Sequence, residues 1–184
     1  MLRTPKTIAS KVVYKNPWLV VREDKIIHAN GKPGIYGLVE SLHDGVYIVP
    51  VDNEGNTYLV KQYRYTEKRE VWECIAGRMN TGEADPLITA KRELFEESGL
   101  EAGTFHHLTD LRVANGMTTF ICPVFLARDI EKTSEELDQE DGILACKKIP
   151  LDTVMEMIMK KEIVCSQSIA AFMIANKFLK DKGI

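Results

Sequence analysis

The segment spanning residues 85–99 carries the sequence signals for both ends of a helix. Asp85 is a favoured N-cap residue and Pro86 a favoured first helical residue, while Gly99 suits the left-handed position that ends a helix. The apolar positions between them are Leu87, Ile88, Ala90, Leu94 and Phe95. This spacing predicts a helix of about 13 residues with one buried face.

The chain before this helix is made of short β-branched and aromatic runs. Such runs fill residues 11–41, where the cluster Asn30–Gly34 supplies the positive and fixed φ angles of a hairpin loop. We therefore predict an N-terminal antiparallel meander. Two further runs, Val46–Val51 and Thr57–Tyr63, flank the turn residues Asn53–Asn56 and predict a second hairpin.

The chain after the helix mixes strand and helix patterns. Phe120–Leu126 and Ile143–Ile149 have the composition of strands, and the acidic stretch between them, residues 131–141, is expected to be an exposed loop. Leu151–Met159 and Ser166–Leu179 have helical apolar spacing. Strands on both sides of a central helix, with helices at the end, predict an α/β fold in which a mixed sheet packs between helices.

Composition narrows the possible partners. The 184 residues suit one domain. The 24 Lys and Arg against 27 Asp and Glu give a net charge of −3, so the overall electrostatic field does not favour binding to nucleic acid. No apolar stretch reaches the ~20 residues of a membrane span, and no targeting segment is evident. The four cysteines lack metal-site spacing and are read as reduced thiols, which favours a cytoplasmic location.

Three carboxylates share one face of the predicted helix. Glu93, Glu96 and Glu97 stand at i, i+3 and i+4, so their Cβ atoms lie roughly 5–6 Å apart and their charges repel. A divalent cation relieves this repulsion, and an all-oxygen ligand set favours Mg²⁺ or Mn²⁺. The alternative is a solvated glutamate-rich helix face, which is common.

The surroundings of these glutamates decide between the two interpretations. Residues 77–100 resemble the Nudix box, in which a glycine, five residues, a glutamate and seven residues precede Arg-Glu-apolar-x-Glu-Glu-x-Gly-apolar. Gly77, Glu83, Arg92 and Gly99 match the fixed positions together with the three glutamates. One departure is an extra residue near Ala84, so that eight residues instead of seven separate Glu83 from Arg92, and the position of Glu83 is open.

The resemblance extends beyond the box to the ADP-ribose pyrophosphatase and nucleoside diphosphate sugar hydrolase branch. The matching segments are Asn16–Trp18, Gly34–Tyr36, Gln62–Tyr65 and Trp72–Gly77. The resemblance implies an α/β/α sandwich forming a single Nudix domain over residues 1–184. It also implies that residues 1–41 help to form a homodimer and that residues 42–184 form the core.

The resemblance also implies a metal site. Glu93 and Glu97 would be the principal Mg²⁺ ligands, with Glu96 and the Ala76 carbonyl completing the site. Arg92 would orient the carboxylates by charge-assisted hydrogen bonds. Glu97 and Arg92 are thus expected among the catalytic residues.

A further catalytic carboxylate is expected from the acidic stretch. Relatives usually take a glutamate from a late loop as base or extra ligand, and Glu140 occupies that place, with Asp138 and Asp141 as alternatives. A merely solvated loop is the competing interpretation.

Three residues are candidates for binding substrate. Arg64 is expected to pair with a substrate phosphate, although a surface arginine in a strand is nearly as common. Trp18 and Tyr36 are candidates for stacking a base across a dimer interface, with ordinary packing as the alternative.

The resemblance implies Mg²⁺-dependent hydrolysis of the diphosphate linkage of a nucleoside diphosphate sugar, with ADP-ribose, cleaved to AMP and ribose 5-phosphate, as the first candidate. Cys165-Ser166-Gln167 stands where nucleotide-sugar hydrolases of this branch tend to show Asp-x-Lys, which disfavours GDP-mannose without excluding it. A nucleotide-binding module without catalysis and an isomerase that uses Cys74 are the rival classes.

Overall fold

The structure is a computed structural model that describes residues 4–135 and 142–183. Within these residues the chain divides into two compact units. The first unit comprises the described residues up to Asp44 together with Arg112–Ile121, and the second comprises Gly45–Leu111 and the described residues from Cys122 onward.

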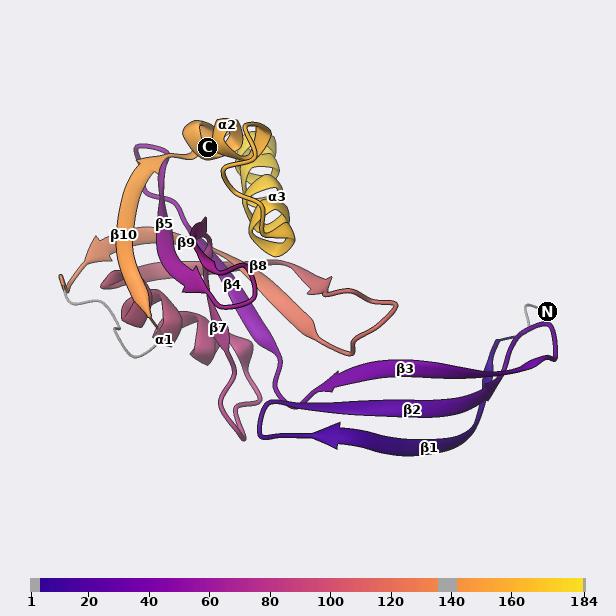
Figure 1. Ribbon diagram of the computed structural model, residues 1–184. Helices are drawn as coiled ribbons and strands as arrows, with labels where there is room; N and C mark the ends of the chain where they lie inside the picture. The colour runs from indigo at the N-terminus through magenta and orange to yellow at the C-terminus, as the bar shows by residue number, and fades with distance from the viewer. Residues whose placement is uncertain (1–3, 136–141, 184) are drawn as a thin grey trace. The chain divides into compact units, whose positions relative to one another are not determined.

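The first unit contains a three-stranded antiparallel sheet in the order β1-β2-β3 (Figure 1). Its strands are β1 (Lys6–Lys15), β2 (Leu19–Ile27) and β3 (Pro33–Ser41). The predicted meander is confirmed, and Gly31 supplies a positive φ of 86° in the turn between β2 and β3. Residues 19–27 form the single strand β2.

The second unit contains two sheets. The three-stranded sheet has the order β10-β5-β6, built from β10 (Ile143–Pro150), β5 (Asn56–Arg64) and β6 (Arg69–Glu73). The four-stranded sheet has the order β7-β4-β9-β8, built from β7 (Ile75–Arg78), β4 (Gly45–Pro50), β9 (Ile121–Lys132) and β8 (Leu100–Arg112). Since β4 pairs antiparallel with β7 and parallel with β9, this sheet is mixed, as predicted.

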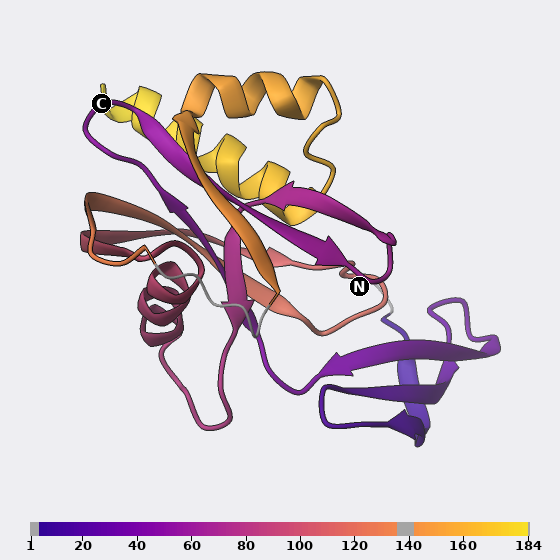
Figure 2. The same ribbon diagram turned by 60° about the vertical axis from the view of Figure 1, so that its left-hand side comes forward.

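The central helix α1 (Pro86–Ser98) has the predicted ends. The Asp85 side chain accepts a hydrogen bond from the Leu87 amide at 2.9 Å, and Gly99 adopts a φ of 66° while its amide donates to the Phe95 carbonyl at 2.7 Å. The helices α2 (Leu151–Met159) and α3 (Ser166–Lys182) lie together on one side of the sheets, and α1 lies on the other (Figure 2). The second unit is therefore an α/β/α sandwich.

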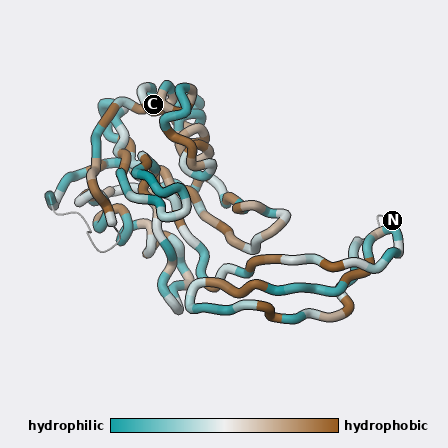
Figure 3. The backbone as a smooth tube through the Cα atoms, in the orientation of Figure 1, coloured by the Kyte–Doolittle hydropathy of each residue, from teal (hydrophilic) through white to brown (hydrophobic). Residues whose placement is uncertain are grey.

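Two hydrophobic clusters fill the spaces between these layers. Along β4, Val46 and Ile48 pack with the α1 residue Leu94, whereas Val49 packs with Phe172 of α3. Hydrophobic residues accordingly recur along the strands and helices of this unit (Figure 3). Because both faces of β4 are covered, the strand reads as a continuous apolar run.

The predicted second hairpin is wrong. The expected turn exists, since the Asp52 side chain accepts hydrogen bonds from the amides of Glu54 and Asn56 at 2.9 Å. However, β4 and β5 belong to different sheets, joined only by an isolated bridge between Val51 and Thr57. Turn residues fix a chain reversal, but they do not determine whether the flanking strands pair.

The expected loop at residues 131–141 also needs correction, because Glu131 and Lys132 form the end of β9. Residues 136–141 lie outside the described residues. No helix in the described parts of the chain is long and apolar enough to cross a membrane.

Candidate functional site

The helix α1 presents two buried carboxylates to the strand β7. Glu93 and Glu97 are only 2% and 3% exposed. The Ala76 amide donates a hydrogen bond to Glu97 Oε2 at 3.0 Å. A Cβ atom on Gly77 would lie 1.8–2.2 Å from the carboxylate atoms of Glu93, so only glycine leaves room for that side chain. The solvated-face interpretation therefore fails for these two glutamates.

Arg92 holds the neighbouring carboxylates in place. Its Nη1 lies 2.8 Å from Glu93 Oε1 and donates to Glu96 Oε2 at 2.8 Å, and its Nη2 donates to the Arg78 carbonyl at 2.9 Å. Burial lowers the pKa of the guanidinium, but the carboxylates of Glu96 and Glu93 outweigh this and raise its pKa. Arg92 thus ties α1 to the end of β7.

Glu83 is held firmly despite the additional residue before the helix. Its Oε2 accepts hydrogen bonds from the Asn80 amide at 2.8 Å and from Thr89 Oγ1 at 2.6 Å. The Thr89 hydroxyl and the Asn80 amide lower the pKa of this carboxyl. Glu83 therefore anchors the loop before α1 to the first turns of the helix.

The residues around α1 fit a hard divalent cation. The buried oxygens of Glu93 and Glu97 are hard carboxylate donors of the kind that Mg²⁺ prefers, and the absent side chain of Gly77 makes the room in which the Glu93 carboxylate lies. In residues 4–135 and 142–183, however, no three His, Cys, Asp or Glu side chains converge as a metal-binding group. The side chains of the described residues therefore do not by themselves form a complete set of metal ligands.

Arg64 is held by a buried carboxylate. Its Nε donates to Glu73 Oε2 at 2.8 Å, and its Nη2 donates to the same oxygen. Glu73 is 4% exposed, whereas the Arg64 side chain is 39% exposed. Burial lowers the pKa of Arg64, but the Glu73 carboxylate outweighs this and raises it. The guanidinium of Arg64 is therefore fixed by Glu73, while the side chain remains partly accessible to solvent.

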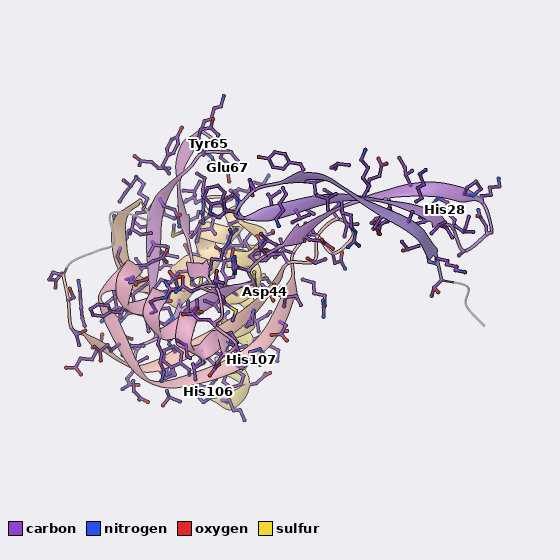
Figure 4. All side chains as sticks on the ribbon, turned by 90° about the horizontal axis from the view of Figure 1, so that it is seen from below. His28, Asp44, Tyr65, Glu67, His106 and His107 are labelled. Atoms are coloured by element: carbon purple, nitrogen blue, oxygen red, sulfur yellow. The ribbon has the colours of Figure 1, made fainter. Side chains whose placement is uncertain are left out.

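The backbone of Arg64 is fixed as well. Its carbonyl accepts hydrogen bonds from the amides of Glu67 and Lys68 at 3.0 and 2.8 Å. Tyr65 and Glu67, labelled in Figure 4, belong to this turn, where Tyr65 is 85% exposed. The turn thus leaves Arg64 as the last residue of β5.

The other predicted site residues are distant in the sequence from the glutamates of α1. In the first unit, Trp18 is 60% exposed and Tyr36 is 45% exposed, with the Tyr36 hydroxyl donating to the Gly116 carbonyl. Glu140, Asp138 and Asp141 fall outside the described residues.

Cys74 lies beside the site but is fully buried. Its Sγ lies 3.0 Å from the Ile48 carbonyl oxygen, and its amide donates to Ser168 Oγ at 3.1 Å. Burial raises the pKa of this thiol well above its usual range. Because the thiolate is the nucleophilic form, these surroundings do not suit the isomerase alternative.

Sequence reasoning missed two residues of this site, Glu73 and Thr89. The signal for Glu73 was a carboxylate within the apolar run Val71–Ala76, where a charge requires a partner. The signal for Thr89 was a β-branched hydroxyl residue in the first turns of a helix.

Comparison with known proteins now gives the class of this fold and site. Residues 5–39 match the model of the nucleoside diphosphate sugar hydrolase N-terminal domain, and residues 41–165 match the NUDIX domain. The chain therefore belongs to the Nudix family of hydrolases.

Curated relatives narrow the comparison. The chain is 33% identical over 167 residues to an ADP-ribose pyrophosphatase of Mycobacterium tuberculosis, covering 90% of this chain and 80% of that protein. It is 30% identical over 161 residues to an ADP-ribose pyrophosphatase of Bacillus subtilis, covering 86% and 85%. A methanol dehydrogenase activator of Bacillus methanolicus is 27% identical over 168 residues, covering 90% and 89%.

A solved structure shares the fold. The crystal structure of an ADP compounds hydrolase superposes with a TM-score of 0.87 at 21% identity, covering 100% of this chain and 98% of that chain. This likeness confirms the predicted Nudix-type fold.

Proposed function

We propose that this protein hydrolyses the diphosphate linkage of ADP-ribose to AMP and ribose 5-phosphate. The observation that carries the proposal is the burial of Glu93 and Glu97 against Ala76 and Gly77 in an intact set of box glutamates. The two relatives named ADP-ribose pyrophosphatase support the substrate.

The proposed cofactor is Mg²⁺, with Mn²⁺ as a substitute. Glu93 and Glu97 would hold it, with Glu96 and the Ala76 carbonyl as further ligands. When bound, such an ion neutralises the non-bridging phosphate oxygens and lowers the pKa of a water molecule.

The residues of the chain prepare this site in advance. The Ala76 amide fixes Glu97, and Arg92 fixes Glu93 and Glu96, so hydrogen bonds hold the carboxylates in place before a cation binds. Arg64, held by Glu73, is proposed to donate to a substrate phosphate through the part of its guanidinium that remains exposed.

The proton of the attacking water requires an acceptor. We assign this role to Glu140, with Asp138 and Asp141 as the alternatives in the same acidic stretch. A carboxylate there would act as general base on the water.

We also propose a homodimer formed through the first unit. Its strands and the β1–β2 turn expose a set of large hydrophobic side chains, namely Ile8, Val12, Val13, Tyr14, Trp18, Ile35 and Tyr36. So many exposed apolar side chains in a small unit are typical of an association surface. In this arrangement Trp18 and Tyr36 would stack on the substrate base across the dimer interface.

We further propose that the chain forms a single domain and is located in the cytoplasm. Residues 1–184 would act as one Nudix hydrolase domain, with residues 1–41 contributing to dimerisation and residues 42–184 forming the core. None of the four cysteines, all within the described residues, is in a disulfide, which supports a cytoplasmic location.

Product analysis tests the proposed function. The purified protein is incubated with Mg²⁺ and ADP-ribose, GDP-mannose, UDP-glucose or 8-oxo-dGTP, and the products are separated. We expect AMP and ribose 5-phosphate from ADP-ribose, lost in Glu97→Gln but kept in Glu156→Gln, which makes the same change at an exposed position on α2.

The outcomes separate the substrate from the mechanism. Cleavage of GDP-mannose instead would replace ADP-ribose by the second candidate, which the match of residues 5–39 to a nucleoside diphosphate sugar hydrolase domain favours. Absence of cleavage by a folded protein that binds Mg²⁺ would contradict hydrolysis and favour a nucleotide-binding module.

A further inference from the structure

A cleft of about 420 Å³ lies between α1 and β8, on a different side of the helix from the buried glutamates. Its walls are Lys91, Arg92 and Phe95 from α1, and Glu101, Ala102 and Phe105 from β8. The volume lies within the range of small-molecule sites, roughly 300–1,000 Å³. Apart from Arg92, which fixes Glu93 and Glu96, the proposed hydrolysis assigns no role to the residues of this cleft.

The interior of the cleft is apolar and partly aromatic. Leu94 forms its floor and is 1% exposed, and Ala102 and Phe105 pack against the same hydrophobic cluster. Phe105 is held edge-on against Phe125, with ring centroids 6.5 Å apart. Phe95 is 43% exposed, so part of its ring is accessible from solvent. These surfaces suit a planar apolar group.

The cationic groups of the cleft are not equivalent. The guanidinium of Arg92 is already bonded to Glu93, Glu96 and the Arg78 carbonyl. None of the ion pairs within residues 4–135 and 142–183 includes Lys91, whose Nζ lies 6.0 Å from the centroid of the Phe105 ring. Lys91 is therefore the cation that a ligand can use.

The acidic group of the cleft is partly engaged. Glu101 Oε1 accepts a hydrogen bond from Thr133 Oγ1 at 3.4 Å. Because Glu93 and Glu96 neutralise Arg92, the Lys91 ammonium is the group of the lining that complements an anion.

We propose that this cleft binds a small planar aromatic anion, with its ring against Phe95 and Phe105 and its anionic group at the Lys91 ammonium. A nucleoside monophosphate has this chemistry. The arrangement combines ring contacts with a single cation–anion pair, so a ligand that carries only one of the two groups makes only part of the contacts.

The test is a titration of the ¹⁵N-labelled full-length protein with phenyl phosphate, followed by two-dimensional NMR. Phenyl phosphate is an aromatic anion without a diphosphate linkage, so it is not a substrate of the proposed reaction. We expect saturable shifts of amides in residues 91–95 and 101–105. Inorganic phosphate and benzyl alcohol, which each carry half of the ligand, are expected to bind at least tenfold more weakly.

Two variants and their controls make the result specific. Lys91→Glu and Phe95→Leu are expected to weaken binding at least tenfold, and both positions are exposed, so the fold should survive. Lys160→Glu, an exposed lysine on the α2–α3 connection, and Ile88→Ala, an exposed α1 residue outside the cleft, are expected to bind as the parent does. Glu97→Gln should also bind normally, which separates this cleft from the hydrolytic site.

The proposal is overturned if no saturable shifts occur in these segments, or if phenyl phosphate perturbs only residues around Glu93 and Glu97. It is also overturned if Lys91→Glu and Phe95→Leu both bind as well as the parent, or if inorganic phosphate alone gives the same shifts.

Discussion

Glu73 Oε2 accepts two N–H groups of the Arg64 guanidinium, with the Nε donor at 2.8 Å. The carboxylate is almost fully buried at the end of β6, whereas the arginine is partly exposed. A buried charge is tolerated only when it is paired. Glu73 therefore determines where the cation of Arg64 lies.

The first prediction concerns this pair. Glu73→Gln removes the charge but keeps the volume, so the unfolding free energy should fall by about 1–3 kcal/mol. The KM for ADP-ribose should rise more than kcat falls, because Arg64 is no longer held for the phosphate. Urea unfolding and steady-state kinetics provide the two readouts. Glu70→Gln is the control, since Glu70 also pairs with a cation, Lys61, but is 51% exposed; equal effects of the two changes would contradict the role of Glu73.

The second prediction concerns Gly77. A Cβ atom there would overlap the Glu93 carboxylate, so Gly77→Ala must displace Glu93 or the β7 backbone. We expect a loss of about 1–3 kcal/mol in unfolding free energy together with nearly complete loss of hydrolysis. Gly37→Ala is the matched control, because a Cβ atom at Gly37 meets nothing within 4 Å. Full activity of Gly77→Ala would exclude Glu93 from the reaction.

The third prediction concerns the planar guanidinium group of Arg92. Arg92→Lys keeps the charge but not the geometry that contacts Glu93, Glu96 and the Arg78 carbonyl together. We expect hydrolysis to fall by about 10–100-fold and the apparent Mg²⁺ affinity to weaken similarly. Arg69→Lys provides the comparison, since Arg69 also forms a two-bonded pair, with Glu67, but is 54% exposed. Unchanged Mg²⁺ dependence in Arg92→Lys would refute the positioning role.

Local signals explain which parts of this protein were predictable. The ends of α1 follow from Asp85 and Gly99 because capping depends on neighbouring residues only. The pairing of β4 and β5 did not follow from their turn, because strand partners are selected by contacts distant in the chain. Glu73 was missed for the same reason, since its partner Arg64 is brought to it by the pairing of β5 with β6.

The fourth prediction concerns acid stability and a carboxyl group outside the site. Burial raises the pKa of Asp52, but hydrogen bonds from Lys148, Asn56 and Glu54 outweigh it and bring the pKa to about 2 from 3.8. Since the folded pKa lies below the unfolded one, the stabilisation is complete above about pH 4 and is lost as the pH falls towards 2. Asp52→Asn should therefore lower the unfolding free energy at pH 7 by about 1 kcal/mol, after allowance for the exposure of Lys148, and by much less at pH 2.

Urea unfolding at pH 7 and pH 2 measures this difference. Asp181→Asn is the control, because Asp181 forms an exposed i,i+4 pair with Lys177. A deficit of Asp52→Asn that is the same at both pH values would show that the lost stability does not come from the ionised carboxylate.

The last prediction concerns Cys74, three residues before Gly77. Its thiol is 0% exposed and its pKa is raised by burial, so it stays protonated and inert at neutral pH. Cys74→Ala should therefore hydrolyse ADP-ribose at close to the parental kcat, while losing about 1 kcal/mol of stability for the missing buried atom. A thiol reagent added to the native protein should label the partly exposed Cys146 and Cys165 before Cys74, and unfolding should remove the difference. Loss of activity in a stably folded Cys74→Ala, or rapid labelling of Cys74, would instead favour chemistry at the thiol, because a buried structural cysteine has neither property.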